Sequence, residues 1–154
     1  IALIIYGVAF ILIERWNKKR KMPIESWKEF SYKDAFTVGL FQILSLIPGT
    51  SRSGSTIMGG ILIGTDRPVA AEFSFFMSIP VMVGASLMKM KGFGFSFTTE
   101  ELVVLLVGSI TSFIVSVVAI KFLIRYIQKN DFTAFGWYRI VVGVLVLLYF
   151  NFIG

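Results

Sequence analysis

The stretch PGTSRSGSTI, residues 48–57, gathers hydroxyl side chains and an arginine in the middle of an otherwise apolar block of the chain. Pro48 removes a backbone donor and the two glycines admit backbone angles that other residues avoid, so we predict a helix break with a second helix beginning near Ser51. The start of a helix presents unpaired backbone N–H groups and the positive end of the helix dipole. This stretch is therefore suited to bind an anion such as phosphate.

Arg52 would supply the charge for such an anion, because its planar guanidinium binds phosphate through two parallel hydrogen bonds. With a helix start near Ser51, Arg52 and Thr56 lie one turn apart on one helix face and can contact the same group. In the structural alternative, Arg52 pairs with carbonyl groups or a buried carboxylate, and the serines only cap the helix. The loop residues predicted to surround the phosphate are Gly49, Thr50, Arg52 and Gly54.

The composition of the 154 residues indicates a membrane protein, since 56% are hydrophobic, 16% are charged and the mean hydropathy is +0.81. The formal charge of +6 comes from short basic runs between apolar blocks, which is typical of cytoplasmic loops and not of a nucleic-acid-binding face. The chain has no cysteine and no histidine, which excludes disulfides and a thiol nucleophile. In a membrane an arginine costs about 2.5 to 3.5 kcal/mol, so Arg52 is functional by default.

The stretch 48–57 lies within a series of apolar blocks of different lengths, which predict the elements around it. Residues 1–13 are too few to cross a hydrocarbon core, which takes about 20 helical residues, and they lack the start of a signal peptide, so we expect further chain before Ile1. Residues 14–34 carry seven Lys or Arg against four Asp or Glu and are predicted to form a cytoplasmic loop. The other predicted elements are a re-entrant helix pair in residues 35–64 and membrane-spanning helices in residues 68–90, 100–125 and 135–154.

The basic segments determine the predicted topology. If residues 14–34 and 121–139 lie on one side of the membrane, the apolar blocks between Pro68 and Ile120 must cross it as a hairpin. The broken block 35–64 must then leave on the side from which it entered, and such backbone is tolerated where protein or water covers it. We therefore predict a single domain of the all-α class, a polytopic membrane protein with transmembrane helices and one re-entrant helix pair.

Two further features have structural interpretations. Glu72 is either a metal ligand or an ion-pair partner of Arg52, or else a solvated charge at a span end, which the usual placement of charge favours. Small residues recur at four-residue spacing in two predicted spans, and we interpret them as helix-packing positions and not as ligand sites. They are Ala70, Ser74 and Ser78 in one span and Gly108, Ser112 and Ser116 in the other.

The segments FQILSLIPGTSRSGSTIMGGILIG and RPVAAEFSFFMSIPVMVGAS together resemble the second signature region of the undecaprenyl-pyrophosphate phosphatase family, which is linked to bacitracin resistance. The resemblance runs through essentially the whole chain as the C-terminal portion of that family. It implies an enzyme of the bacterial inner membrane, built from inverted repeats with two re-entrant helix pairs. Such an enzyme removes one phosphate from a C55 polyprenyl diphosphate, recycles the carrier lipid of the cell wall and uses Mg²⁺ or Ca²⁺.

The same resemblance implies roles for individual residues. Arg52 would hold the pyrophosphate, with Ser53 and Thr56 as hydroxyl donors. Ser51 or Ser53 would be the nucleophile if the mechanism is covalent, although a serine needs an activating base. Gln42 stands where an inverted repeat would place a glutamate, and either contacts phosphate or makes a structural bond. The metal-binding carboxylates belong to a first signature that is absent here and is expected upstream of Ile1.

Two competing functions remain at this stage. A transporter or flippase for a polyprenyl phosphate lipid would also place broken helices and helix N-termini around an anion. A purely structural membrane subunit gives no reason for an arginine and five hydroxyls at a helix break. The expected partners are the lipid diphosphate substrate and membrane lipids, with no nucleic acid, and a homodimer is a further expectation.

Overall fold

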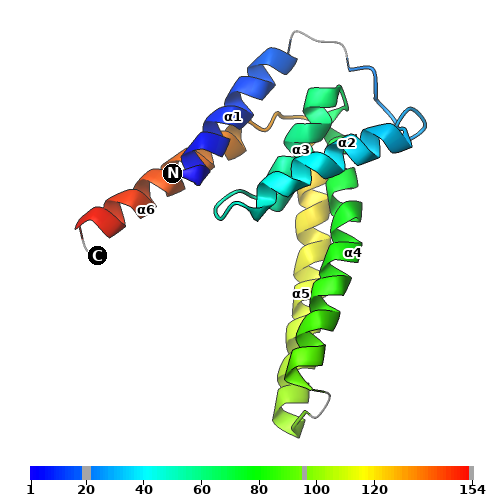
Figure 1. Ribbon diagram of the computed structural model, residues 1–154, viewed down its shortest axis with the longest axis vertical. Helices are drawn as coiled ribbons and strands as arrows, with labels where there is room; N and C mark the ends of the chain where they lie inside the picture. The colour runs from blue at the N-terminus through cyan, green and yellow to red at the C-terminus, as the bar shows by residue number, and fades with distance from the viewer. Residues whose placement is uncertain (19–21, 95–96, 153–154) are drawn as a thin grey trace.

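The computed structural model describes residues 1–18, 22–94 and 97–152, and the regular elements in them are helices apart from one isolated bridge. Residues 19–21 of the predicted cytoplasmic loop and residues 153–154 of the predicted last span lie outside the described residues. The all-α class is confirmed. The elements are α1 (Ala2–Asn17), α2 (Tyr32–Gln42), a short 3₁₀ helix η1 (Ile43–Leu46), α3 (Arg52–Ile63), α4 (Arg67–Phe93), α5 (Thr99–Ile127) and α6 (Thr133–Phe152) (Figure 1).

The helices form two long pairs that meet at a corner. Helices α1 and α6 pack along each other as one arm, and α4 and α5 form a hairpin that extends from the corner as the second arm (Figure 1). The short helices α2 and α3 pack together at the corner, and α3 contacts both α1 and α4. Helix α3, which follows the predicted break, is therefore the element that joins the two arms.

Capping residues account for where two helices begin. The Thr98 hydroxyl accepts a hydrogen bond from the Glu101 backbone N–H (3.3 Å), and the Glu101 carboxylate accepts one from the Thr98 backbone N–H (2.8 Å). Ser31 and Asp34 form the same reciprocal pair at the start of α2. Each pair satisfies backbone donors that the helix itself leaves free.

Helices α2 and α3 are short, with 11 and 12 residues. At about 1.5 Å per residue they are about 17 and 18 Å long, little more than half of a hydrocarbon core of about 30 Å. They pack tightly, because a Cβ atom added to Gly59 would lie 2.6 Å from the ring of Phe41. These lengths suit the predicted re-entrant pair, whose course through a membrane stays a prediction.

Three glycines set the contact between α1 and α6. A Cβ added to Gly7 would lie 2.7 Å from the carbonyl oxygen of Gly136, and one added to Gly136 would lie 2.8 Å from that of Gly7. Near the other end of the contact, a Cβ on Gly143 would lie 2.7 Å from the side chain of Ile4. The two backbones therefore approach antiparallel and closely, as small residues allow in membrane helices.

The predicted packing positions have mixed outcomes. In α4, Ala70 packs against Gly60 of α3, where an added Cβ would lie 2.9 Å from the Ala70 Cβ, and Ser74 hydrogen-bonds to Thr56 at 2.6 Å. In α5, by contrast, a Cβ added to Gly108 would meet no atom within 4 Å in the described structure. Ala70 and Ser74 of the first set thus contact a neighbouring helix, and Gly108 of the second set does not.

A buried ion pair joins the helix ends at the corner. The Glu14 carboxylate is 0% exposed and accepts hydrogen bonds from Arg67 Nε (3.1 Å), Arg67 Nη2 (2.7 Å) and the backbone N–H of Phe132 (3.2 Å). Beside it, the Lys18 ammonium lies 2.9 Å from the Asp131 carboxylate and lowers the pKa of Asp131 from its ordinary value. The two segments predicted to share one side of the membrane therefore lie together.

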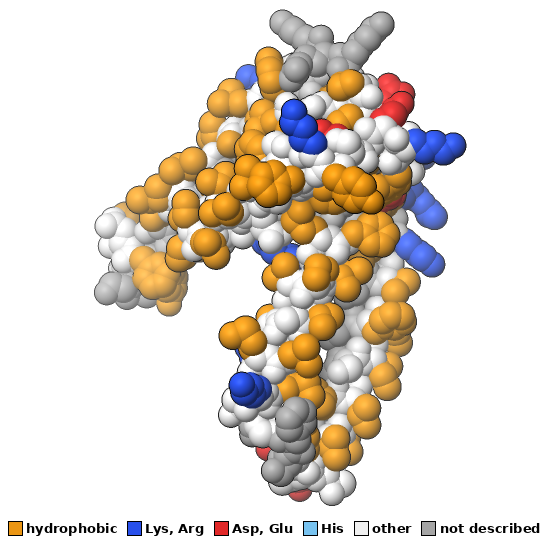
Figure 2. Space-filling view, turned by 45° about the vertical axis from the view of Figure 1, so that its right-hand side comes forward, with side chains coloured by type: hydrophobic (Ala, Val, Ile, Leu, Met, Phe, Trp, Pro, Cys, Tyr) orange, Lys and Arg blue, Asp and Glu red, His pale blue; other side chains and the backbone are white. Residues whose placement is uncertain are grey.

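The buried core occupies the same corner, and the arms are exposed. By length and composition, Arg67–Gly92, Thr99–Ile127 and Thr133–Phe152 are each able to cross a membrane. Figure 2 displays hydrophobic side chains along the whole α4–α5 arm, a surface suited to lipid or to other membrane helices. The chain is a multi-pass membrane protein. Its core cluster consists of Phe10, Ile57, Met58, Ile61, Ala70, Ala71, Ile127 and Phe132.

We expect Gly136→Leu to lower the free energy of unfolding by about 1 to 3 kcal/mol, because its side chain would be forced against the α1 backbone, which cannot move aside locally. Gly108→Leu adds the same side chain to a long apolar helix where space is open, and serves as the matched control. Thermal unfolding in detergent, followed by circular dichroism, measures both. Equal effects of the two substitutions would contradict the close α1–α6 contact.

We expect Glu14→Gln to destabilise the fold by about 3 kcal/mol, because it removes the charge that compensates Arg67 in a buried pair. Glu100→Gln removes an exposed carboxylate from the first turn of α5 and should change stability by less than about 0.5 kcal/mol. The same unfolding measurement compares the two. A Glu14 variant as stable as the control would show that the junction does not depend on this pair.

Candidate anion-binding site at the helix break

The chain reverses direction between η1 and α3 through a tight loop. Gly49 has φ +89°, a left-handed conformation that favours glycine. The Thr50 hydroxyl lies 2.8 Å from the Leu44 carbonyl oxygen and 2.7 Å from that of Ile47, and donates its one proton between them. Helix α3 then begins at Arg52 with Ser51 as its N-cap, which confirms the helix start predicted near Ser51.

Ser51 caps the helix through its side chain. Its Oγ accepts a hydrogen bond from the Gly54 backbone N–H (3.1 Å) and lies 3.1 Å from the Ser53 Oγ. A Cβ on Gly54 would lie 3.1 Å from the Ser51 Cβ and 3.3 Å from the Phe10 ring, so a larger residue would crowd the cap. The backbone N–H groups of Arg52 and Ser53 belong to the first turn, where the helix supplies no acceptor. They are the donors available to an anion.

Several buried polar atoms at the break have unmet hydrogen-bonding capacity, among them Ser55 Oγ and Arg139 Nε. Arg52 Nη1 is buried without a hydrogen-bond partner among the described residues, and so is Gln42 Oε1 at the end of α2. Most buried polar atoms in folded proteins are paired, so each such atom calls for an explanation. An anion bound at the loop would satisfy the Arg52 guanidinium. A donor group, such as water or a hydroxyl, would satisfy Gln42.

Thr56 faces away from the loop mouth. Its side chain is 1% exposed, and its Oγ1 lies 2.6 Å from the Ser74 Oγ on α4. The same hydroxyl lies 3.2 Å from the Arg52 carbonyl oxygen and 3.0 Å from that of Ser53. The structure therefore gives Thr56 a contact between α3 and α4, and a direct role with substrate stays a prediction.

A second arginine reaches the loop from α6. Arg139 Nη2 donates a hydrogen bond to the Gly49 carbonyl oxygen (3.1 Å), and its guanidinium carbon lies 5.8 Å from the centre of the Tyr6 ring. In the sequence we interpreted Arg139 only as the last residue of the basic segment 121–139. The available signal was a lone arginine in an apolar helix, since ionisable residues inside membrane segments are usually functional.

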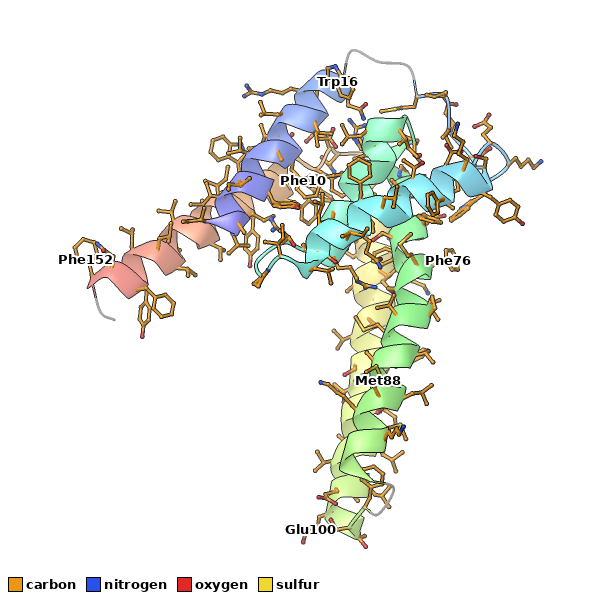
Figure 3. All side chains as sticks on the ribbon, viewed as in Figure 1. Phe10, Trp16, Phe76, Met88, Glu100 and Phe152 are labelled. Atoms are coloured by element: carbon orange, nitrogen blue, oxygen red, sulfur yellow. The ribbon has the colours of Figure 1, made fainter. Side chains whose placement is uncertain are left out.

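A cavity of about 220 Å³ adjoins the loop. One part of its wall is polar and is formed by Ser51, Ser53 and Arg139. The rest is apolar, and Phe10 of this wall lies at the corner between α1 and α3 (Figure 3). A cavity with these two walls is suited to a molecule that has an anionic end and an apolar tail. The apolar wall comprises Phe10, Ile57, Leu123, Phe132, Phe135 and Tyr138.

The acidic residues of this chain lie apart from the break. Glu72 Oε2 accepts a hydrogen bond from Trp27 Nε1 (2.9 Å), which ties the segment before α2 to α4. Within the described ranges, no group of three or more Asp, Glu, His or Cys side chains comes together. The carboxylates expected upstream of Ile1 stay a prediction.

The fold and the site define a class, an all-α multi-pass membrane protein with an anion-suited loop between two short helices. The model of the family described as bacitracin resistance protein BacA matches residues 1–145, and the chain belongs to this family. Curated relatives named undecaprenyl-diphosphatase are similar over nearly the whole chain. One from Desulfitobacterium hafniense is 55% identical over 152 residues, which cover 98% of this chain and 55% of the relative.

Two further relatives of the same name give the same result. The protein from Acetivibrio thermocellus is 56% identical over 150 residues, covering 97% of this chain and 55% of the relative. The protein from Enterococcus faecalis is 55% identical over 155 residues, covering 99% of this chain and 56% of the relative. The chain thus spans about half the length of the curated relatives it matches.

We expect Arg139→Ala to loosen the loop, because the Gly49 carbonyl would lose a charged donor that holds it to α6. Amide hydrogen exchange over residues 47–54 should become about tenfold faster, the equivalent of one hydrogen bond to a charged group. Arg15→Ala removes an exposed arginine from α1 and should leave exchange in the loop unchanged. Unchanged protection in the Arg139 variant would mean that the contact does not hold the loop.

Proposed function

We propose that this chain is part of an undecaprenyl-diphosphate phosphatase, which hydrolyses undecaprenyl diphosphate to undecaprenyl phosphate and inorganic phosphate. The observation that carries the proposal is the unpartnered Nη1 of Arg52, buried at the start of α3. Its neighbours Ser51 and Ser53 line a cavity with a polar and an apolar wall, and Arg52 itself is not part of that lining. Membership of the family and the names of the relatives support the same reaction. The whole activity belongs to a protein about twice the length of this chain, as the relatives are.

In the proposed reaction, Arg52 and the first-turn N–H groups of α3 bind the diphosphate. Hydrolysis breaks a phosphoanhydride P–O bond and leaves charge on the transferring phosphoryl group and on the departing oxygen. A fixed guanidinium and aligned backbone dipoles stabilise such charge without having to reorient during the reaction. Arg139, held to the Gly49 carbonyl, keeps the loop in the conformation that presents these donors.

The two serines of the loop take different parts in this proposal. Ser51 accepts the Gly54 N–H as the helix cap, so moving its hydroxyl would disturb the start of α3. Ser53 has no such capping bond, and lies 3.1 Å from Ser51 on the wall of the same cavity. We therefore assign the hydroxyl donor to Ser53. Catalytic roles for Ser51 and Thr56, and phosphate contacts of Thr50 and Gln42, remain predictions from the sequence.

The cavity beside the loop supports a lipid substrate. Its aromatic and aliphatic wall begins directly beside the serines, so the first isoprene units could lie against it while the diphosphate contacts the loop. Burying this apolar surface contributes about 25 cal/mol per Å² to binding. This placement of the substrate accounts for the hydroxyl and aromatic side chains that line the same cavity.

Dependence on Mg²⁺ or Ca²⁺ is part of the proposal and rests on the resemblance alone. The residues that the structure describes do not fit such an ion, because their carboxylates do not gather. No step above therefore passes through a metal. Location in the bacterial inner membrane, recycling of the cell-wall carrier lipid, resistance to bacitracin, the inverted-repeat architecture and a homodimer belong to the same proposal.

The test is phosphate release from a C55 or C15 polyprenyl diphosphate in detergent, with Mg²⁺ or Ca²⁺ and with EDTA. We expect the chain as the cell makes it to release phosphate only with the metal. We expect Arg52→Ala to lower the rate by about 100-fold or more, as for loss of one group that stabilises transition-state charge.

Arg125→Ala is the matched control, since it removes an arginine from an exposed position on α5. It should retain the parental rate. Circular dichroism and gel filtration establish that both variants fold. A parent protein that binds the lipid diphosphate but releases no phosphate would contradict the phosphatase and favour the flippase.

A further inference from the structure

A second cavity lies at the corner, at the opposite ends of the helices from the tips of the two arms. It has a volume of about 570 Å³ and is bounded by the end of α1, the start of α4 and the segment that joins α5 to α6. It shares no lining residue with the cavity at the helix break. Its polar lining includes Asn17, Lys18, Arg67, Gln128, Lys129 and Asp131.

Asn17 is the residue of this cavity that points to a ligand. Its side chain is only 3% exposed, and both Nδ2 and Oδ1 lack a hydrogen-bond partner in the part of the chain that the structure describes. Leaving a buried amide unpaired is unfavourable, and such groups in folded proteins are rarely left without a partner. The Asn17 amide therefore calls for a molecule that accepts one hydrogen bond and donates another.

The charges around the cavity select an anion. Lys18, Arg67 and Lys129 face one carboxylate, Asp131, and even with the buried Glu14 counted the positive charges are in excess. Lys18 is paired with Asp131, and Glu14 occupies Nε and Nη2 of Arg67. Lys129 has no ion-pair partner among the described residues, so its ammonium is available to a ligand.

The position of the cavity favours a lipid as the source of that anion. It lies where α5 ends, and the preceding turns of α5 carry exposed apolar side chains such as Phe122 (69% exposed) and Val118 (63%). Acyl chains can lie along these residues while a headgroup reaches the polar ends of the helices. Basic pockets at the cytoplasmic ends of membrane helices are suited to anionic lipid headgroups.

We propose that this cavity binds the headgroup of an anionic phospholipid that also carries a hydroxyl group, of the phosphatidylglycerol type. The phosphate accepts hydrogen bonds from Lys129 Nζ and Asn17 Nδ2, and a headgroup hydroxyl donates to Asn17 Oδ1. One ligand thus satisfies both atoms of the buried amide. The site is independent of the proposed phosphatase reaction, because it contains none of the residues assigned to that reaction.

The test measures binding through thermal stability and so does not require activity. The chain as the cell makes it, in a neutral detergent, is titrated with phosphatidylglycerol, with phosphatidylcholine and with soluble glycerol phosphate. We expect phosphatidylglycerol alone to raise the unfolding temperature, because a ligand that binds the folded state stabilises it. Lys129→Gln should weaken this binding about tenfold, as for loss of one hydrogen bond to a charged group, and Asn17→Ala should weaken it by more than that, because it removes both contacts of the amide.

Lys121→Gln is the matched control, with the same charge change at an exposed α5 position outside the cavity. It should bind phosphatidylglycerol like the parent. If Asn17→Ala does not fold, Lys129→Gln still tests whether the cavity binds the headgroup, because Lys129 is an exposed residue. Equal stabilisation by phosphatidylcholine, or equal loss in the Lys121 and Lys129 variants, would overturn the site. If glycerol phosphate stabilises the protein as strongly as phosphatidylglycerol does, the bound anion does not need to come from a lipid, and that part of the proposal is overturned.

Discussion

The arrangement of the helices depends on the buried carboxylate of Glu14. A carboxylate that is removed from water is stable only when charged and hydrogen-bonding partners surround it. Glu14 obtains them from Arg67 at the start of α4 and from the backbone of Phe132 just before α6. The end of one arm and the beginning of the other are thereby held at one point. Helix α3 packs against α1 and α4, and Arg139 of α6 reaches the loop that precedes α3.

The sequence predicted the features that depend on neighbouring residues. Proline and glycine located the break, and the helix start near Ser51 was predictable because a cap acts within three residues of itself. Glu14 and Arg139 were assigned to a loop and to a membrane boundary, since charge usually lies at span ends. Their actual partners are 53 and 90 residues away in the chain, Arg67 and Gly49. No periodicity or local motif carries that information, so only the folded structure reveals it.

Helix packing illustrates the same limit. Small residues at regular spacing are compatible with a close helix contact, but they do not state which helix comes close. Gly7 and Gly136 meet backbone to backbone, whereas Gly108 faces open space in the described structure. In the relatives, nearly half of the protein lies outside the matched part, so they have further chain that could pack against an arm such as α4–α5. A spacing rule thus identifies candidates for packing and leaves their partners undetermined.

Most of the hydroxyl groups at the break have a structural contact in the folded chain. Thr50 closes the turn onto two carbonyl groups, Ser51 caps α3, and Thr56 joins α3 to α4. Each of these hydroxyls is occupied in holding the backbone, which is what preorganises the donors of Arg52 and Ser53. A loop that binds an anion must remain rigid without it, because donors that had to be ordered during binding would reduce affinity. Thr50, Ser51 and Thr56 therefore contribute to the rigidity of the loop, which is what the proposed anion contacts of Arg52 and Ser53 require.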